Sequence, residues 1–238
     1  MNFDLTYKPF GASAILIEWP SKIDEDIIQD IINFEKIIPK TPLILDTIIA
    51  YNSLTILYKE LNFYENTVLQ IKELYQSNRV SEKKDQKLWI IPVCYDELFG
   101  LDLEEIAKKK NSSIKEIIEL HSTTIYSVYF IGFLPGFLYL GGLVPELYTP
   151  RKSTPRLRIN QGSVGIGGKQ TGIYPSNSSG GWNIIGKSPV NFFNINITPS
   201  CFANPGDKIQ FQKITIDTFY KIEKQIADGK YQLKSELL

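Results

Sequence analysis

Apolar positions in the first eighty residues follow two spacings, one typical of strands and one typical of helices. Residues 24–38 place isoleucines and a phenylalanine nearly on one face of a helix, which Asp24 can cap and Pro39 can end. The other expected elements are strands at 4–7 and 14–18, a hairpin of 43–50 with 53–58, and a helix at 65–76. This βαββα pattern predicts an α+β domain over residues 1–80, with its helices on one face of a small sheet.

A polar, charged stretch follows this domain, and short strands dominate the chain beyond it. We expect a linker at 81–87 and a second, mainly-β domain over 88–238. Its expected helices are 102–110, 113–121 and 217–228, with Asp102 and either Ser112 or Ser113 as candidate caps and Gly229 as the end of the last one. Its expected strands are 88–94, 126–131, 163–166, 183–185, 192–197 and 208–213. Short strands bounded by Gly, Pro and Asn predict a closed or nearly closed β-barrel.

Composition narrows the class of protein. The 26 basic residues balance the 26 acidic ones, which argues against nucleic acid as a partner. Cys94 and Cys201 are isolated, so we expect reduced thiols rather than a disulfide scaffold. The N-terminal residues lack the features of a signal peptide, and we expect a cytoplasmic protein. Residues 122–145 carry no charge and are long enough to span a membrane, but their Pro-Gly and Gly-Gly pairs would break a helix, so we expect a strand and a structured loop there.

Glycines mark the segment from His121 to Pro189, which holds twelve of the sixteen in the chain. The run GSVGIGGKQTG matches neither standard nucleotide loop: Ser163 stands where a phosphate loop needs glycine, and Gln170 stands where a dinucleotide fingerprint needs one. Backbone approach to a ligand remains, with Lys169, Gln170 and Tyr174 beside it. The alternative is that these glycines form the corners of a barrel.

Arginines cluster in the same segment. Three of the four in the chain are Arg151, Arg156 and Arg158, although lysine fills 22 of the 26 basic positions. Because a guanidinium can hold carboxylate or phosphate with two parallel hydrogen bonds, the cluster predicts an anion site. The alternative is that these arginines bind backbone carbonyls or pair with acidic neighbours such as Glu146.

His121 is the only histidine, so any mechanism that needs an imidazole must use it. It can act as a general base or, alternatively, cap the end of a helix. One histidine and two distant cysteines make a zinc site improbable, and we expect no bound metal. Trp182 can stack on a ligand or fill a core. The aromatic residues that precede the arginines form a core stripe or, alternatively, a pocket wall; they are Phe130, Phe133, Phe137 and Tyr139.

The order of these motifs resembles the KipI/PxpB family, also called allophanate hydrolase subunit 1. The resemblance is carried by His121-Ser122 and four further strings, GFLPGFLYLGGL (132–143), PRKSTPR (150–156), GSVGIGGKQTGIYP (162–175) and GGWNIIGKSP (180–189). Residues 91–95 and 205–207 are also similar, so nearly the whole chain is covered. Ser179 departs from the family, which usually has proline there, and this change should loosen the turn.

The resemblance implies a ferredoxin-like α+β N-terminal domain and a cyclophilin-like β-barrel C-terminal domain. It implies the B-type (PxpB-like) component of a bacterial 5-oxoprolinase, which opens 5-oxo-L-proline to L-glutamate with ATP, as Mg-ATP, and with A-type (PxpA-like) and C-type (PxpC/KipA-like) subunits. The family also implies two alternatives, an inhibitor that binds a sporulation histidine kinase and a component of a biotin-dependent urea carboxylase. A prolyl isomerase, suggested by the barrel alone, is weaker because fold does not determine function.

We expect a composite site in a barrel cleft that the C-type subunit completes, because this chain has no recognisable nucleotide motif. The candidate catalytic residues, which meet developing phosphate charge, hold the substrate carboxylate or move protons, are His121, Arg151, Arg156, Lys169 and Tyr174. The candidate substrate-binding residues are Gln170, Gly167, Gly168, Gly180, Gly181, Trp182 and Phe133.

Overall fold

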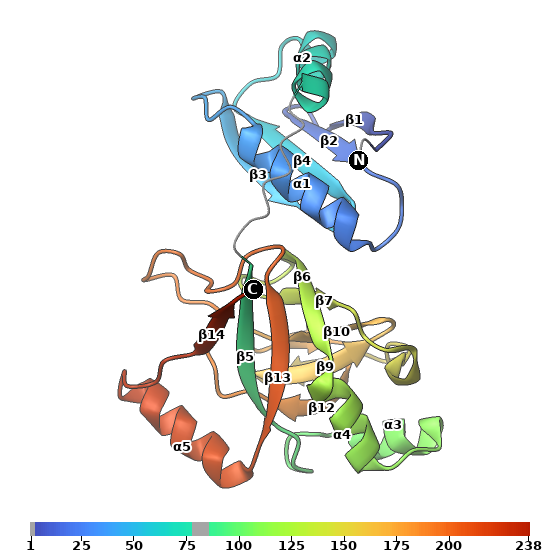
Figure 1. Ribbon diagram of the computed structural model, residues 1–238, viewed down its shortest axis with the longest axis vertical. Coiled ribbons are helices and arrows are strands. Elements are labelled where there is room, and N and C mark those ends of the chain that lie inside the picture. Colours follow the sequence, from blue (N-terminus) through green and yellow to red (C-terminus); the bar gives the residue numbers. More distant parts are fainter. Residues whose placement is uncertain (1–2, 78–85) are drawn as a thin grey trace. The chain divides into compact units, whose positions relative to one another are not determined.

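The computed structural model describes residues 3–77 and 86–238 (Figure 1). The chain forms two compact units, Met1–Lys84 and Asp85–Leu238. Most of the linker expected at 81–87 lies outside the described residues.

The first unit is an antiparallel sheet with strand order β1-β2-β4-β3 and two helices. Its elements are β1 (Thr6–Phe10), β2 (Ala14–Glu18), α1 (Glu25–Ile37), β3 (Ile44–Ile49), β4 (Ser53–Tyr58) and α2 (Tyr64–Ser77). Figure 1 shows α1 lying across one face of the sheet, where its isoleucines join the core formed by β2 and β4.

Helix α1 begins and ends where the sequence predicts. The Asp24 carboxylate accepts a hydrogen bond from the Asp26 amide at 2.9 Å, which satisfies a backbone donor that the first turn leaves free. Ile27 and Ile31 are fully buried against the sheet, and Pro39 follows the C-terminal cap. The expected hairpin is also confirmed, since β3 and β4 pair directly in sequence.

The second unit contains a closed barrel of seven strands in the order β12-β9-β10-β7-β6-β13-β5, which the pairing of β12 with β5 completes. Its elements are β5 (Lys87–Cys94), α3 (Leu103–Lys110), α4 (Ile114–Thr123), β6 (Ile125–Ile131), β7 (Leu138–Gly141), η1 (Pro145–Leu147), β8 (Arg156–Ile159), β9 (Ser163–Gly167), β10 (Gln170–Ile173), β11 (Ser178–Gly180), β12 (Asn183–Lys187), β13 (Lys208–Ile214), α5 (Ile216–Ala227) and β14 (Lys234–Leu237). Strands β5 and β13 are parallel, and every other pairing in the ring is antiparallel. Strand β14 adds to β5 outside the ring.

The barrel interior and the helices beside it share one hydrophobic core. Helix α4 begins with a complete capping box, in which Ser113 and Glu116 each accept a hydrogen bond from the other's backbone amide. Asp102 precedes α3 as expected but makes no capping bond with its side chain. Its carboxylate instead binds Arg156, Lys152 and the Ile184 amide.

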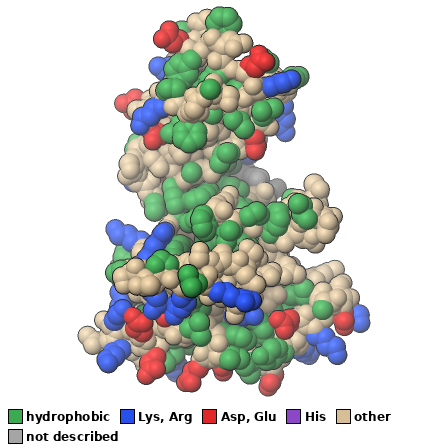
Figure 2. Space-filling model, turned by 180° about the vertical axis from the view of Figure 1, so that it is seen from behind, with side chains coloured by type: hydrophobic (Ala, Val, Ile, Leu, Met, Phe, Trp, Pro, Cys, Tyr) green, Lys and Arg blue, Asp and Glu red, His purple; other side chains and the backbone are tan. Residues whose placement is uncertain are grey.

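The strand expected at 192–197 is wrong, whereas the uncharged segment 122–145 forms strands as expected. Residues 193–197 alternate apolar and polar side chains, but 192–197 form irregular structure and a turn, with Ile195 79% exposed. The Asn194 amide donates a 2.8 Å hydrogen bond to the Ser200 carbonyl, so a local turn satisfies this backbone in place of a neighbouring strand. Residues 122–145 include β6 and β7, and none of the helices in the described part of the chain is long and apolar enough to cross a membrane. Acidic and basic side chains are interspersed on both units in the face drawn in Figure 2.

Candidate functional site

Strands β9 and β10 carry large side chains into the barrel and glycines on its outer wall. Val164, Ile166 and Ile173 point into the core, as alternation along a strand requires. The intervening positions hold Gly165, Gly167 and Gly172; the indole of Trp182 lies against Gly167 and Gly172, and the Cβ atom of Trp182 lies near Gly165.

The indole leaves no room for a side chain at Gly167, where a Cβ would lie 2.5 Å from Nε1 of Trp182. At Gly172 a Cβ would lie 2.8 Å from the backbone oxygen of Leu138 and 3.1 Å from Cζ3 of Trp182. Gly168 differs, because a Cβ there would meet nothing within 4 Å and its φ of +68° suits the turn between β9 and β10. The backbone freedom of this segment therefore serves close packing of a side chain at Gly167 and a tight, open turn at Gly168.

Trp182 belongs to an aromatic cluster on the outer wall, formed with Phe137, Tyr139 and Tyr174. Phe137 lies at the centre, with ring centroids 4.7 Å from Tyr139, 5.4 Å from Tyr174 and 5.5 Å from Trp182. Tyr174 is 3% exposed, and its hydroxyl packs where a Cβ at Gly180 would lie only 2.4 Å away. Burial raises the pKa of Tyr174, so its phenol stays neutral and does not face solvent.

Arg151 covers the outer side of this cluster. Its guanidinium carbon lies 5.7 Å from the centre of the Trp182 ring, in the geometry of a cation–π contact. The side chain is exposed, and no acidic partner within the described residues forms an ion pair with it. The indole is thus sandwiched between the glycines and the guanidinium, which presents a planar, unpaired cation to solvent.

Lys169 reaches the same edge of the barrel through a backbone bridge. Thr149 and Gly168 exchange two hydrogen bonds, of 3.1 and 2.7 Å, which places the segment before Arg151 beside the β9–β10 turn. Lys169 is exposed at this turn, with Nζ 5.7 Å from the ring centre of Tyr148. The same edge of the barrel therefore carries a second exposed cation.

Two further predicted residues flank the cluster. The Nε2 atom of Gln170 is buried and has no hydrogen-bond partner within the described residues. Phe133 is 76% exposed, and its ring centroid lies 6.4 Å from that of Phe137. Its backbone has a φ of +66°, which favours glycine rather than phenylalanine. An exposed aromatic ring and an unsatisfied amide are features of functional surfaces.

Arg156 does not join this open set of cations. Its guanidinium donates two hydrogen bonds, of 2.7 and 2.8 Å, to the carboxylate of Asp102, which is 2% exposed. Asp102 also accepts bonds from Lys152 and from the Ile184 amide, at 2.8 and 2.6 Å. Burial raises the pKa of Asp102, but the bonds from Arg156, Lys152 and Ile184 outweigh that effect and lower it. This ion pair fastens β8 to α3 and β12.

His121 lies inside the barrel, on the other side of the wall from the aromatic cluster. It is fully buried, with Nδ1 2.8 Å from the Tyr95 hydroxyl and Nε2 2.8 Å from the Thr171 hydroxyl. Its ring stacks on Phe211 at 4.6 Å, and burial lowers its pKa to about 3. Both ring nitrogens have hydrogen-bond partners within the protein, and this geometry favours the structural alternative for His121 over the general base.

The structure thus divides the predicted residues into two groups. Arg151, Lys169, Gln170, Phe133 and Trp182 lie on the outer wall, whereas His121 and Arg156 are fixed by bonds within the protein. Sequence reasoning missed Asp102 as the partner of Arg156, because the two are 54 positions apart and the position of Asp102 before a helix suggested a cap.

Comparisons with known proteins agree over most of the chain. Residues 5–203 match the family described as carboxyltransferase domain, subdomain C and D. The chain is 34% identical over 228 residues to the 5-oxoprolinase B subunit of Bacillus subtilis (strain 168), an alignment that covers 90% of this chain and 95% of that protein. It is 35% identical over 203 residues to the 5-oxoprolinase B subunit of Haemophilus influenzae, and this alignment covers 85% of this chain and 95% of that protein.

Solved structures show the same architecture. The protein TTHA0988 matches 84% of this chain with a TM-score of 0.74 and 30% identity, and the match spans 40% of that longer chain. The urea amidolyase of Kluyveromyces lactis matches 98% of this chain with a TM-score of 0.83 at 18% identity, over 16% of its own length, which is a likeness of fold.

Proposed function

We propose, since this chain belongs to the carboxyltransferase subdomain C and D family, that it is the B-type component of an ATP-dependent 5-oxoprolinase. The single observation that carries this proposal is the 34% identity to such a component along nearly the full length of both proteins. With A-type and C-type subunits, the chain would open 5-oxo-L-proline to L-glutamate, with Mg-ATP held by the assembled enzyme. We propose cytoplasmic location on the same ground.

The two units would then be a ferredoxin-like domain and a cyclophilin-like barrel. A four-stranded antiparallel sheet covered by α1 supports the first assignment, and the closed mixed barrel supports the second.

The proposed contribution of this chain is a preorganised cation on the outer wall of the barrel. The substrate is a small ring that carries a carboxylate, and its lactam is a poor electrophile that phosphorylation of the amide oxygen would activate. Arg151 can hold the carboxylate with two parallel hydrogen bonds, and its cation–π contact with Trp182 keeps the guanidinium over the aromatic cluster. Lys169 supplies a second positive charge nearby for a developing phosphate.

A composite site explains features that the chain alone leaves incomplete. The buried amide of Gln170 lacks a partner among the described residues, and Phe133 exposes an aromatic ring in an unfavourable backbone conformation. A surface of the C-type subunit laid against this wall would cover the ring and exclude water from the cations, which strengthens their interaction with an anion. His121, Arg156 and Tyr174 would act by holding the wall rather than by touching substrate.

The test is reconstitution with the A-type and C-type subunits, followed by measurement of ATP hydrolysis that depends on 5-oxoproline. We expect Arg151→Ala to lower kcat/KM by about 10- to 100-fold, the loss of a charge-assisted bond pair, mainly through KM. Arg158→Ala is the matched control, because Arg158 is an exposed arginine on β8, and it should stay within about twofold.

Two results would overturn the proposal. An inactive three-component mixture that contains this chain would remove the assignment as the B-type component. Turnover by this chain alone would remove the composite site.

A further inference from the structure

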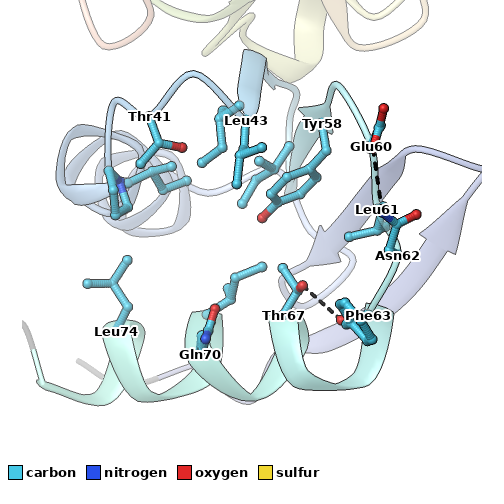
Figure 3. Close-up of a pocket in the computed structure, with 15 residues that line it drawn as sticks. Thr41, Leu43, Tyr58, Glu60, Leu61, Asn62, Phe63, Thr67, Gln70 and Leu74 are labelled. Atoms are coloured by element: carbon cyan, nitrogen blue, oxygen red, sulfur yellow. Dashed lines mark hydrogen bonds between the residues drawn. The ribbon is translucent and has the colours of Figure 1, made fainter.

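The first unit contains a cavity of about 530 Å³ that the proposed function does not use. Figure 3 shows helix α2 as one wall, and the opposite wall comes from the segment that follows α1 and from the end of β4. Its lining includes Ile38, Leu43, Tyr58, Phe63, Gln70 and Ile71. Its volume is within the range of small-molecule sites, which is roughly 300–1,000 Å³.

The inner surface of the cavity is apolar. Ile38, Ile56 and Ile71 are buried members of the core of this unit, so the cavity opens directly onto that core. At the mouth, Leu43 is 61% exposed and Phe63 is 73% exposed, which extends the apolar surface outward. Such a surface gains free energy when an apolar group displaces water from it.

The Tyr58 hydroxyl is directed into this mainly apolar space. Tyr58, the last residue of β4, is 8% exposed, and Figure 3 shows its hydroxyl pointing into the cavity. No described residue is a hydrogen-bond partner of this hydroxyl. Burial raises the pKa of Tyr58 to about 12, so the phenol is neutral and can donate or accept one bond. Because no described protein group uses this hydroxyl, a ligand with a matching group can form a hydrogen bond with it in place of water.

Charge around the cavity disfavours an anion. Glu60 is the one charged residue among the described residues of the lining. An adjoining hollow shares Ile38, Pro39, Thr41 and Ile44 with the cavity, and it adds two carboxylates, Glu35 and Asp46, against one cation, Lys40. A carboxylate or phosphate brought here would be desolvated beside negative charge, which is unfavourable.

We propose that this cavity binds a neutral, mainly apolar small molecule that carries one hydrogen-bonding group, such as an alcohol, ketone or amide, directed at the Tyr58 hydroxyl. The proposed ligand is neutral, whereas 5-oxoproline and ATP are anions. The cavity lies in the first unit, so it is a different site from the one proposed on the barrel. The proposal does not depend on the proposed function.

The experiment is a fluorescence titration of the full chain with Nile red, a neutral apolar dye with a carbonyl group. We expect saturable binding and displacement of the dye by 1-octanol. Octanoate, which has the same chain length but an anionic end, should displace it at least about tenfold less well. Tyr58→Phe should lower the affinity for 1-octanol by about fivefold, which is the contribution of one neutral hydrogen bond.

A matched pair of variants on α2 tests the location. Gln70→Trp places an indole in the cavity and should abolish dye binding, whereas Leu69→Trp adds the same group at an exposed position outside the lining and should leave the affinity within about twofold. Circular dichroism melts confirm that both variants fold.

The possible negative results are distinct. No saturable binding, equal displacement by octanol and octanoate, or unchanged binding by Gln70→Trp would each overturn the proposal. Loss of dye binding when the A-type and C-type subunits are added would overturn it in favour of a partner's apolar side chain as the occupant.

Discussion

Gly167→Ala tests whether the glycine-rich strands exist to seat the Trp182 indole. The added Cβ would lie 2.5 Å from Nε1 and 2.6 Å from each of Cδ1 and Cε2, about 1 Å inside normal contact. The φ angle of Gly167 is not in the left-handed region, so the cost comes from overpacking alone. We expect a destabilisation of about 1–3 kcal/mol, the usual range for an extra carbon in a closely packed layer.

Urea denaturation of the full chain, followed by far-ultraviolet circular dichroism, measures this cost. Gly181→Ala is the control, because a Cβ there would meet its nearest atom at 3.4 Å, and it should change the free energy of unfolding by less than about 0.5 kcal/mol. Trp182→Val removes the three crowded atoms, so Gly167→Ala should become nearly neutral in that background. A penalty that persists without the indole would refute the packing argument.

Two further predictions concern buried polar groups. Asp102→Ala should lower the free energy of unfolding in urea by about 2 kcal/mol, less than for a fully buried pair because Arg156 and Lys152 can turn toward water. The stability from this carboxylate is present above its ordinary pKa of 3.8 and is lost as pH falls through the lowered pKa of the folded state. A cost below about 0.5 kcal/mol would contradict the role of the ion pair. The folded pKa of His121 is about 3 against an ordinary 6.5, so between these values the unfolded chain binds the extra proton and stability falls with falling pH, by at most about 1.4 kcal/mol per pH unit. His121→Gln should remove that part of the slope, and an unchanged pH profile of the denaturation midpoint would show that His121 does not titrate as its burial requires.

Local signals predicted the helices well. Helices α1 and α4 begin at residues whose side chains bond the first turn, Asp24 and Ser113, and these signals need no knowledge of the rest of the fold. Strand 192–197 failed for the opposite reason. Its alternating pattern is genuine, but a strand needs a neighbour, and whether one is available depends on how the barrel closes.

The candidate site shows the same limit. The sequence identified the segment, and the structure places Arg151, Lys169 and Phe133 on one wall. The sequence could not show that Arg156 is paired, because Asp102 lies far away in the chain. Nor could it show that the glycines face an indole, because that contact depends on Trp182 returning to the outer side of β9.

The way the ring of strands closes has a consequence during protein synthesis. Strand β5 pairs along its whole length with β13, and its partner residues are about 120 positions away, as in the pair of Leu88 with Lys208. The ribosome must therefore deliver Ile214 before the barrel can close, whereas every strand of the first unit finds its neighbour within the first 58 residues. We expect the first unit to fold early on the emerging chain, while β5 lacks β13 and the barrel stays open, and therefore prone to aggregation, until translation is nearly complete.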